Sequence, residues 1–329
     1  MDKVRVALIG CGGFQRYRVS NLNKVKDAEI VALVDPSPEQ IAMMKEAHPN
    51  TAGLQGFTDH KEMLQQVRPD AVMIATPHTQ HVDQIIDAFE AGAAALSEKP
   101  LVTTVADAKR VIEARDKAGK VGMVSYQRHF QPEFRYIREK IASGVAGEVQ
   151  YITVLQSQEW LRATKGTWRQ TQSLSGGGQL NDSGSHVLDI VLWATHSSPK
   201  TVSAFTDNKG TEVDINSTLS VKFQNGGMAS FAIIGDGMSW HEEITVWCDN
   251  EAYFIRDGKL TIVDRARNKF KAENLSGGST PDQNFVDAIL GKAECESPFE
   301  CGLEVIRLTE AAWKSSDLGG APVDVSSLG

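Results

Sequence analysis

Three polar side chains of this sequence have the types and spacing needed to move a proton and stabilise a developing charge. Lys99 follows the apolar run Ala93–Leu96, while Asp182 and His186 stand four residues apart near the start of a helical stretch. Imidazole titrates near neutral pH and can accept a hydroxyl proton. A carboxylate one helical turn away can hold the ring in one tautomer, and an ammonium group can stabilise an alkoxide. Side chains of these three types could together deprotonate a hydroxyl group and stabilise the charge that develops.

Each of these residues, taken alone, has a plainer explanation. A lysine after a strand is usually solvated, and a histidine beside an apolar helical run such as Val187–Trp193 is usually part of the core. An aspartate before a helix is often its N-cap. Asp189 is either a supporting residue or a substrate contact. Only the combination of these residues behind a cofactor site favours catalysis over the plainer explanations.

A glycine-rich turn predicts that the second reactant is a dinucleotide. Gly10 and Gly12 directly follow the apolar run Val4–Ile9 and directly precede a helix that starts near Phe14. Gly10 permits a tight turn, and Gly12, with Gly13 beside it, lets the backbone approach a pyrophosphate at the helix N-terminus. We therefore expect these glycines and the first helical turn to bind the cofactor. The context of strand, turn and helix is what gives the motif its weight.

Asp35 predicts which dinucleotide this is. It ends the second apolar run, Ile30–Val34, about twenty residues beyond the glycines, where an acid meets a ribose 2′-hydroxyl. A carboxylate there repels a 2′-phosphate, and Pro36–Pro38 supplies no arginine to receive one, so NAD is favoured over NADP. Asp35 could instead cap the next helix, although Ser37 can fill that role. Gln15 replaces the third glycine of the motif, and we expect its side chain to loosen the packing of helix on strand unless Gly13 lets the loop compensate.

The first part of the chain predicts the sheet that would position these groups. Short apolar runs alternate with helical stretches, as in a parallel sheet covered on both faces. The helix from Thr79 to Gly92 is one example, with apolar residues at steps of three and four. We expect a doubly wound α/β Rossmann domain over residues 1–124. The expected strands are Val4–Ile9, Ile30–Val34, Ala71–Ala75, Ala93–Leu96 and Val121–Val124.

Residues 125–329 predict a second domain of a different kind. A helix over Pro132–Ser143 and a strand over Val149–Leu155 come first. Two hairpins follow, one turning at Asn225–Gly227 and one at Asp257–Gly258, dipeptides that suit the positive φ of such turns. We expect an α+β domain with an open, mainly antiparallel sheet that serves substrate binding and oligomerisation. Because an open sheet needs a partner for its free face, we expect a dimer or tetramer.

Composition excludes several classes of protein. The 329 residues include 41% hydrophobic and 23% charged residues, a globular balance, and the net charge of −8 gives no basic face for nucleic acid. No apolar run reaches the ~18 residues that a membrane span needs. The strand-like start has no signal-peptide cleavage site, and the four cysteines lack zinc or disulfide spacing. We therefore expect a cytoplasmic protein with neither a membrane nor a metal site.

Several segments resemble the Gfo/Idh/MocA oxidoreductases, and the similarity runs over nearly the whole chain. The segments that carry the resemblance are Thr76-Pro77 with His81, Glu98-Lys99-Pro100, Tyr126–Phe130, Trp168-Arg169, and Gly176–Gly178 followed by Asp182, Gly184, His186 and Asp189. Where the family often has asparagine after Pro77, this sequence has His78. The three-glycine segment suggests either a flexible lip over the nicotinamide or a plain connection.

The resemblance implies a role for each matching position. His186 is the proton acceptor, Lys99 stabilises the alkoxide at the nicotinamide, and Asp182 orients His186. The cofactor-binding residues expected from the turn and the resemblance together are Gly10, Gly12, Gly13, Phe14, Asp35, Thr76, Pro77, His78, His81, Glu98, Lys99, Gln127, Trp168 and Arg169. The expected substrate-binding residues are Lys99, Arg128, Trp160, Arg162, Asp182 and His186, with Trp240 and His241 as weaker candidates. A metal site of Asp182, His186 and Asp189 is conceivable but unneeded, because hydride transfer to nicotinamide requires none.

The expected activity is NAD-dependent oxidation of a secondary hydroxyl on a sugar, an anhydrosugar or an inositol. Aromatic rings would cover the C–H faces of such a substrate, and polar side chains would bind its hydroxyls. Some members of the family oxidise a sugar transiently and cleave its glycosidic bond by elimination, and the sequence does not separate that activity from a dehydrogenase. A silent dinucleotide sensor is less favoured, because Lys99, Asp182 and His186 are all present.

Overall fold

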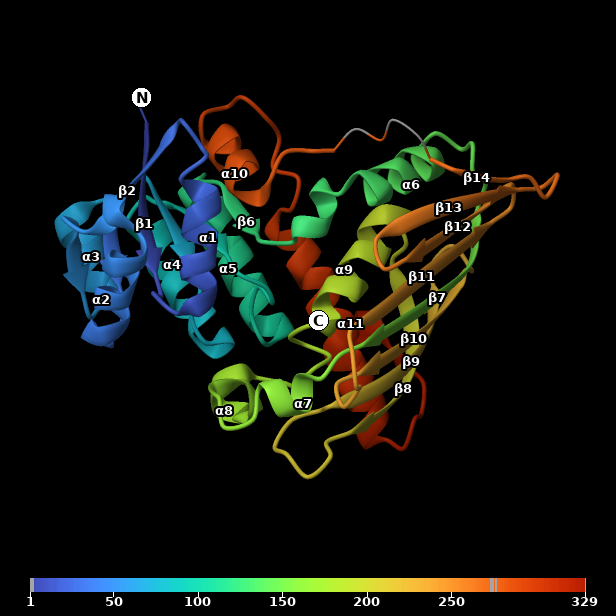
Figure 1. Ribbon diagram of the computed structural model, residues 1–329. Coiled ribbons are helices and arrows are strands. Elements are labelled where there is room, and N and C mark those ends of the chain that lie inside the picture. Colours follow the sequence, from blue (N-terminus) through green and yellow to red (C-terminus); the bar gives the residue numbers. More distant parts are fainter. Residues whose placement is uncertain (1–2, 273–274, 276, 329) are drawn as a thin grey trace. The chain divides into compact units, whose positions relative to one another are not determined.

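The computed structural model describes residues 3–272, 275 and 277–328, which pack as two compact units (Figure 1). Unit 1 consists of Met1–Val102, Ala106–Ser125 and Ser279–Gly302, and unit 2 consists of Thr103–Val105, Tyr126–Gly278 and Leu303–Gly329. Apart from the three residues Thr103–Val105, the chain passes to unit 2 after residue 125, returns to unit 1 for a short segment, and ends in unit 2. None of the described helices has the length and apolar character to cross a bilayer.

Unit 1 is built on a six-stranded sheet in the order β3-β2-β1-β4-β5-β6, and every pair of neighbours is parallel. Its strands are β1 (Val4–Ile9), β2 (Ala28–Val34), β3 (Gln55–Phe57), β4 (Ala71–Ile74), β5 (Ala94–Ser97) and β6 (Gly122–Val124). This order is that of the Rossmann fold, so the predicted doubly wound sheet is confirmed. The sequence analysis missed β3, whose residues include a glycine and an exposed glutamine rather than an apolar run.

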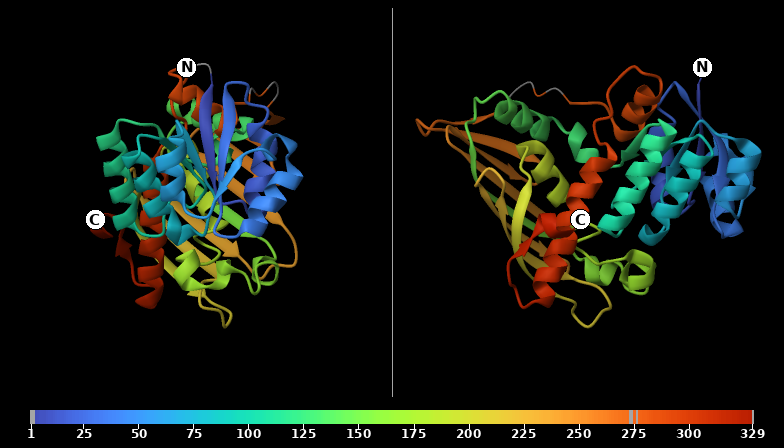
Figure 2. Two further views of the ribbon diagram at one scale, coloured as in Figure 1. Left: turned by 90° about the vertical axis from the view of Figure 1, so that its left-hand side faces the viewer. Right: turned by 180° about the vertical axis from the view of Figure 1, so that it is seen from behind.

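Helices lie on both sides of this sheet (Figures 1 and 2). They are α1 (Gly13–Leu22), α2 (Pro38–Ala47), α3 (His60–Val67), α4 (His81–Glu90), α5 (Val105–Ala118) and α10 (Pro281–Ile289). Because both faces are covered, β4 and β5 are buried at every position, which explains their continuous apolar sequence. The predicted helix over Thr79–Gly92 corresponds to a 3₁₀ turn, η2 (His78–Gln80), followed by α4.

The segment that returns to unit 1 carries α10, which packs on α1. The guanidinium of Arg18 on α1 donates to the Asp282 carboxylate on α10 at 2.8 Å, and both side chains are buried. The sequence analysis divided the chain once, at residues 124 and 125, and did not foresee this return. A single contact of this kind, between residues far apart in the chain, leaves no local signal in the sequence.

Unit 2 is built on a nine-stranded sheet in the order β14-β13-β12-β11-β7-β10-β9-β8-β15. Its strands are β7 (Val149–Ser157), β8 (Pro199–Asp207), β9 (Asn216–Phe223), β10 (Met228–Ile234), β11 (His241–Cys248), β12 (Glu251–Arg256), β13 (Lys259–Asp264), β14 (Lys269–Lys271) and β15 (Val323–Asp324). Only β7 and β10 pair in parallel; the other neighbours are antiparallel. Both predicted hairpins, β9–β10 and β12–β13, are confirmed.

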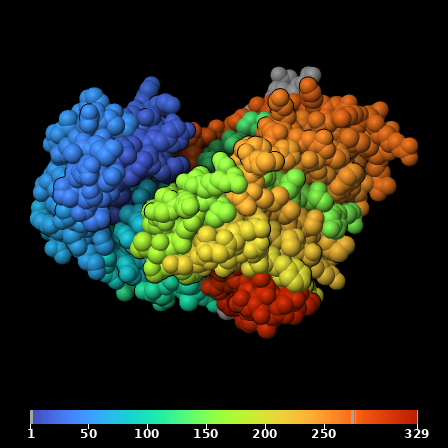
Figure 3. Space-filling model, turned by 60° about the horizontal axis from the view of Figure 1, so that its bottom comes forward, coloured from blue at the N-terminus to red at the C-terminus, as the bar shows by residue number. Residues whose placement is uncertain are grey.

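The longer helices of unit 2 lie on one face of its sheet (Figures 1 and 2). The helices are α6 (Pro132–Ala142), α7 (Trp160–Ala163), α8 (Gln172–Ser175), α9 (Gly184–Thr195) and α11 (Phe299–Asp317), whose first residues belong to unit 1. The 3₁₀ turns of the chain, besides η2, are η1 (Pro49–Thr51), η3 (Gln127–Phe130), η4 (Trp168–Gln170) and η5 (Val325–Leu328). In Figure 3 the red atoms of the C-terminal segment lie beside yellow atoms, and β15 in that segment pairs with β8.

Candidate functional site

The candidate cofactor residues of unit 1 gather at the carboxyl ends of its parallel strands. Gly10 follows β1, Asp35 follows β2, Thr76 follows β4 and Glu98 follows β5. Neighbouring β1 and β4 are where the strand order of the sheet reverses. Ligands of open α/β sheets bind at such a switch point, outside the carboxyl ends of the strands. The fold therefore brings the glycine turn, the acid and the Glu-Lys-Pro segment to one edge of unit 1.

The glycine turn leaves room for a ligand in front of α1. Gly10 has a φ of +91°, and a side chain on it would overlap the carbonyl oxygen of Ala75. A Cβ on Gly12 would meet no described atom within 4 Å beyond its chain neighbours, and one on Gly13 would meet only Arg16 Nη2, at 3.9 Å. Gly12 caps α1 without a side-chain bond, so the first amides of the helix stay available to an anion. This open backbone fits the pyrophosphate of a dinucleotide.

Asp35 is fixed against the turn by two backbone amides. Its Oδ2 accepts a hydrogen bond from Cys11 N at 2.8 Å, and its Oδ1 accepts one from Ser37 N at 2.9 Å. Ser37, not Asp35, is the N-cap of α2, with its hydroxyl accepting from Gln40 N. The capping explanation for Asp35 is therefore wrong. Each carboxylate oxygen keeps acceptor capacity that a ribose hydroxyl can use.

Gln15 packs into unit 1 rather than loosening it. The side chain is 1% exposed, and its amide nitrogen donates to the Met73 carbonyl of β4 at 3.4 Å. The expected loosening is therefore wrong, because the glutamine reaches the sheet and bonds to it. The neighbouring Cys11 thiol is buried, which raises its pKa to about 12, so it stays protonated at neutral pH.

His81 links the two segments that follow β4 and β5. The ring is fully buried, with Nε2 3.1 Å from the Thr76 carbonyl and Nδ1 3.0 Å from the Pro100 carbonyl. The Leu101 carbonyl and the Ser97 hydroxyl are also within hydrogen-bonding distance of Nδ1. Burial lowers the His81 pKa, so the ring is neutral. A fully buried ring cannot contact a cofactor directly; we expected such a contact, and the structure gives His81 a positioning role instead.

Glu98 is held in a buried ion-pair network. Arg18 donates to Glu98 Oε1 at 2.6 Å and to Asp282 at 2.8 Å, and all three residues are less than one tenth exposed. The turn that carries Lys99 is thus fixed through its preceding residue, while Lys99 itself is half-buried. We expected Glu98 to bind the cofactor, whereas its carboxylate bonds Arg18. The sequence analysis missed Arg18, whose signal is a charge on the buried face of α1.

The other candidates of unit 1 remain at or near the same edge. Thr76 donates its hydroxyl proton to Gln84 Oε1 at 2.7 Å. His78 is 4% exposed, and its ring centroid lies 5.9 Å from that of His81. Phe14 is 49% exposed on the first turn of α1. Of these, Phe14 offers the largest accessible surface to a ligand.

In unit 2, Asp182 is anchored by two donors. Its Oδ2 accepts a hydrogen bond from the indole nitrogen of Trp160 at 2.9 Å and another from Arg169 Nε at 3.2 Å. Helix α9 begins only at Gly184, so Asp182 precedes the helix and the expected one-turn helical step to His186 is wrong. Ser183, not Asp182, stands at the N-cap. The two donors fix the orientation of the Asp182 carboxylate.

The tryptophans and arginines of this region differ from expectation. Trp160 is 4% exposed in a cluster with Val213 and Ile215, so its ring has no open face for a sugar, and the expected substrate contact is wrong. Arg169 stacks over the Trp168 ring at 4.6 Å. Arg162 is exposed and pairs with Glu159 at 2.8 Å.

The two weaker candidates stand where the chain enters β11. Trp240, just before the strand, is 53% exposed. His241 is the first residue of β11, and its Nδ1 lies 3.5 Å from the Asp257 carboxylate.

Arg128 is also already occupied. Its guanidinium makes a bidentate ion pair with Glu242 of β11, at 2.8 and 2.6 Å, and both residues are less than one tenth exposed. We expected Arg128 to bind substrate, whereas it joins η3 to the sheet. Gln127 beside it is exposed. The sequence analysis missed Glu242, which looked like one of many acidic residues in a strand.

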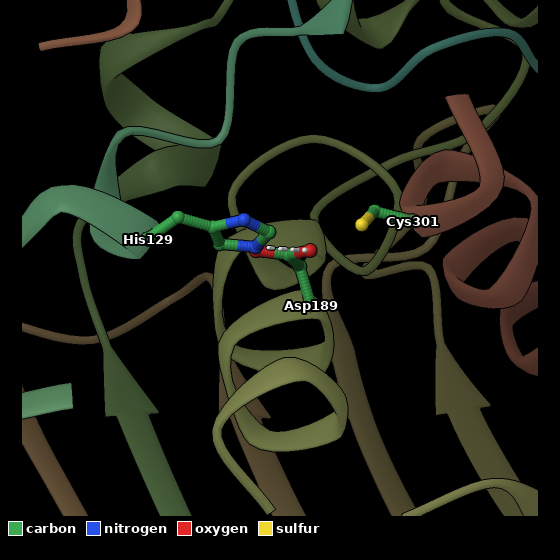
Figure 4. A group of neighbouring side chains, drawn as sticks. All are labelled: His129, Asp189 and Cys301. Atoms are coloured by element: carbon green, nitrogen blue, oxygen red, sulfur yellow. Dashed lines mark hydrogen bonds and ion pairs between the residues drawn. The ribbon is translucent and has the colours of Figure 1, made fainter. Parts of the chain in front are cut away.

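A buried pair fixes the helix that carries His186. His129 Nε2 lies 2.9 Å from the Asp189 carboxylate, and Figure 4 shows the carboxylate directed at the ring. The same ring stacks on Trp193 at 4.3 Å and lies 6.1 Å from Tyr126, whose ring in turn lies 6.4 Å from His186. Burial raises the Asp189 pKa, and at 2% exposure the residue supports the helix rather than binding substrate. His186 itself is half-buried in the first turn of α9.

The segment Gly176–Gly178 is packed rather than flexible. A side chain on Gly178 would overlap the Asp214 carbonyl oxygen, and one on Gly177 would lie 2.5 Å from Trp313. The buried Asp214 carboxylate accepts from Gly178 N at 3.0 Å, from Leu180 N at 2.7 Å and from Trp313 Nε1 at 3.0 Å. Of the two explanations, the flexible lip is therefore wrong. The segment rigidly positions the residues that lead to Asp182.

Sequence models of one family match both parts of the chain. The model described as the oxidoreductase family with an NAD-binding Rossmann fold matches residues 4–126, and that of the GFO/IDH/MocA C-terminal domain matches residues 134–252. The chain belongs to the Gfo/Idh/MocA oxidoreductase family. An NAD-binding Rossmann domain and NAD as cofactor, both predicted from Gly10, Gly12 and Asp35, are thereby confirmed.

Individual proteins similar to this chain agree with this assignment. Inositol 2-dehydrogenase of Corynebacterium glutamicum is 25% identical over 98% of this chain and 97% of its own. D-glucoside 3-dehydrogenase of Escherichia coli is 29% identical over 58% of this chain; because the match covers 53% of that enzyme, the chain spans about half its length. The WlbA dehydrogenase of Bordetella pertussis, solved with NADH and UDP-GlcNAcA, has a TM-score of 0.85 at 23% identity, covers 98% of both chains and so shows the shared fold.

Proposed function

We propose that this oxidoreductase is an NAD-dependent dehydrogenase that oxidises a secondary hydroxyl of a sugar, an anhydrosugar or an inositol. The observation that carries the proposal is the open glycine turn in front of α1 with the fixed Asp35 carboxylate beside it. Relatives named for inositol and glucoside substrates support the polyol class. Polar side chains such as Arg169 beside Asp182 suit a substrate rich in hydroxyls.

The proposed reaction moves one proton and one hydride. When bound, NAD supplies the hydride acceptor. We propose that His186 accepts the hydroxyl proton, that the Lys99 ammonium stabilises the oxygen as its C–O bond becomes a carbonyl, and that Asp182 orients His186 and stabilises its cation. Trp160 and Arg169 keep Asp182 in one place, because both donate to the same carboxylate oxygen. Glu98 and His81 hold the turn that carries Lys99.

A panel of monosaccharides, anhydrosugars and inositols tests the activity. The protein is incubated with NAD and each compound, and the absorbance of reduced nicotinamide is followed. Steady formation of NADH together with a keto product supports the dehydrogenase. Release of the aglycone from an aryl glycoside without net NADH would replace the proposal with a glycosidase that uses transient oxidation. Tight NADH binding with no reaction on any compound would replace it with a dinucleotide sensor.

We also propose that a second copy of the chain covers the free face of the nine-stranded sheet. Met228, Tyr151 and Trp247 stand opposite one another on neighbouring strands of that face and are 48%, 37% and 46% exposed. The next row contains small side chains such as Ser230 and Thr153, which keep the face flat enough for another sheet. Sedimentation should show a dimer or tetramer that Trp247→Glu dissociates. A wild-type monomer at micromolar concentration would refute this interface.

A further inference from the structure

Two arginines of α1, two residues apart, lie in opposite electrostatic environments. Arg18 is 4% exposed and bonds two carboxylates, those of Glu98 and Asp282. Arg16 is half-buried, and none of the ion pairs among the described residues includes it. No described acid therefore lies within ion-pairing distance of its guanidinium. Arg16 is therefore a cation near a ligand site that forms no ion pair with a described acid, and this calls for an explanation that Arg18 does not need.

Arg16 folds back along the glycine turn. Its Nη1 donates to the Cys11 carbonyl at 2.6 Å and to Gln40 Oε1 on α2 at 2.8 Å, both neutral acceptors. Its Nη2 lies 3.9 Å from the position of a Cβ on Gly13. Neither Nη2 nor Nε donates a hydrogen bond to any residue that the structure describes. Guanidinium donors of this kind, arranged in a planar fork, suit a phosphate group.

Asp35 and Arg16 bind opposite ends of the same residue. The Asp35 carboxylate accepts from Cys11 N, whereas the Arg16 guanidinium donates to Cys11 O. An anion and a cation therefore stand one residue apart at the edge where the ribose of the adenosine half would lie. A 2′-hydroxyl would donate to the carboxylate, whereas a 2′-phosphate would be repelled by it and attracted by the guanidinium. The two side chains thus act in opposite directions on the same substituent.

We propose that Arg16 is a latent binding residue for a 2′-phosphate and that the Asp35 carboxylate alone keeps the site selective for NAD. This inference rests on the proposed role of the glycine turn in binding NAD. Asp35 cannot turn away from a phosphate, because two backbone amides hold its two oxygens. Arg16 can turn toward one, because it would give up hydrogen bonds to neutral acceptors only. Pro36–Pro38, which lack an arginine, are not the source of the cation; the source is on α1.

Binding of NADH and NADPH to the cofactor-free protein tests this coupling. Isothermal titration calorimetry is done on wild type, Asp35→Ser, Arg16→Gln and the double variant. We expect Asp35→Ser to raise NADPH affinity by about tenfold or more, and to raise it by less than about threefold when Arg16 is already glutamine. Arg16→Gln alone should change NADH affinity by less than about threefold. NADPH binding to Asp35→Ser should also weaken more steeply with salt than binding to the double variant.

Two controls separate the possible failures. Arg110→Ala removes an exposed arginine of the same unit and should leave the gain from Asp35→Ser intact. Asp35→Asn, which keeps the shape of the side chain, replaces Asp35→Ser if that variant loses its cooperative melting transition. An equal gain in NADPH affinity with and without Arg16 would overturn this inference alone. A wild-type protein that binds no NADH would overturn the proposed function, and the inference with it.

Discussion

The two glycine clusters of this chain look alike in sequence and differ completely in structure. Around Gly12 and Gly13, an added side chain would extend into open space in front of α1. Around Gly177 and Gly178, it would collide with Trp313 or the backbone of Asp214. The first cluster leaves room for a ligand, whereas the second lets two segments of unit 2 pack closely. A cluster of glycines therefore indicates that something packs closely against the backbone there. It does not say whether that is a ligand or another segment of the protein.

The same contrast separates the acids that follow these clusters. Asp35 accepts two backbone amides and is half-buried, so it retains acceptor capacity on an accessible side. Asp214 accepts two amides and an indole and is 6% exposed, so its capacity is spent within the protein. The exposure of a carboxylate and the number of protein donors that it accepts thus distinguish one that can bind a ligand from one that only holds the structure together. The substitutions below test this distinction.

The largest effect on stability is expected from Gly178→Ala. The new methyl group would overlap the Asp214 carbonyl, so either the glycine segment or the loop before β9 must move. We expect the free energy of unfolding to fall by about 3 kcal/mol, measured by urea denaturation. Gly12→Ala, whose methyl group points into open space, is the matched control and should cost less than about 1 kcal/mol. Equal losses in the two variants would contradict the contrast between the clusters.

A smaller effect, on binding rather than stability, is expected from Gly12→Ala. The methyl group would occupy the space through which a pyrophosphate approaches the first amides of α1. NADH affinity should fall by about tenfold or more, measured by calorimetry. Gly53→Ala, at another glycine with open space in unit 1, should leave NADH affinity unchanged. Retained affinity in Gly12→Ala would mean that the open turn is not the cofactor site.

The smallest effect is expected from His81→Gln, on the way the free energy of unfolding depends on pH. Burial lowers the His81 pKa in the folded protein below its ordinary value of 6.5, so the unfolded chain binds more protons as the pH falls through that value. The wild type should therefore lose free energy of unfolding below about pH 6.5, by at most about 1.4 kcal/mol per pH unit for this residue. His81→Gln should show a flatter profile in urea denaturation at several pH values. Parallel profiles would show that His81 is not the residue responsible.

Patterns confined to one element were predictable from the sequence. Five of the six strands of unit 1 were recognised, as were the hairpins β9–β10 and β12–β13 and the dinucleotide turn, because period, turn residues and glycine spacing are local properties. The short β3 was missed because three residues that include Gln55 and Gly56 carry no apolar signal. The return of residues 279–302 to unit 1 was missed for the opposite reason, since it depends on a distant contact.

The sequence could not predict the role of a residue where that role depends on a bonding partner distant in the chain. Trp160, Arg128 and Glu98 were expected at a ligand, yet each bonds a side chain distant in sequence: Asp182, Glu242 and Arg18, respectively. A residue type states which interactions are possible, and burial decides which of them the protein itself uses. The family motifs identified the segments that form the site. The contacts in the structure then showed which residues of those segments are open to a ligand and which instead hold neighbouring residues in place.

The most direct test of the account is a separation of turnover from cofactor binding in Lys99→Ala and His186→Ala. Both variants are measured on the sugar or inositol that wild type oxidises, and Lys120→Ala, at an exposed lysine of unit 1, is the matched control. The account predicts that turnover falls by about a thousandfold or more in each variant, while NADH affinity changes by less than about threefold. Turnover like that of the wild type in either variant would contradict it.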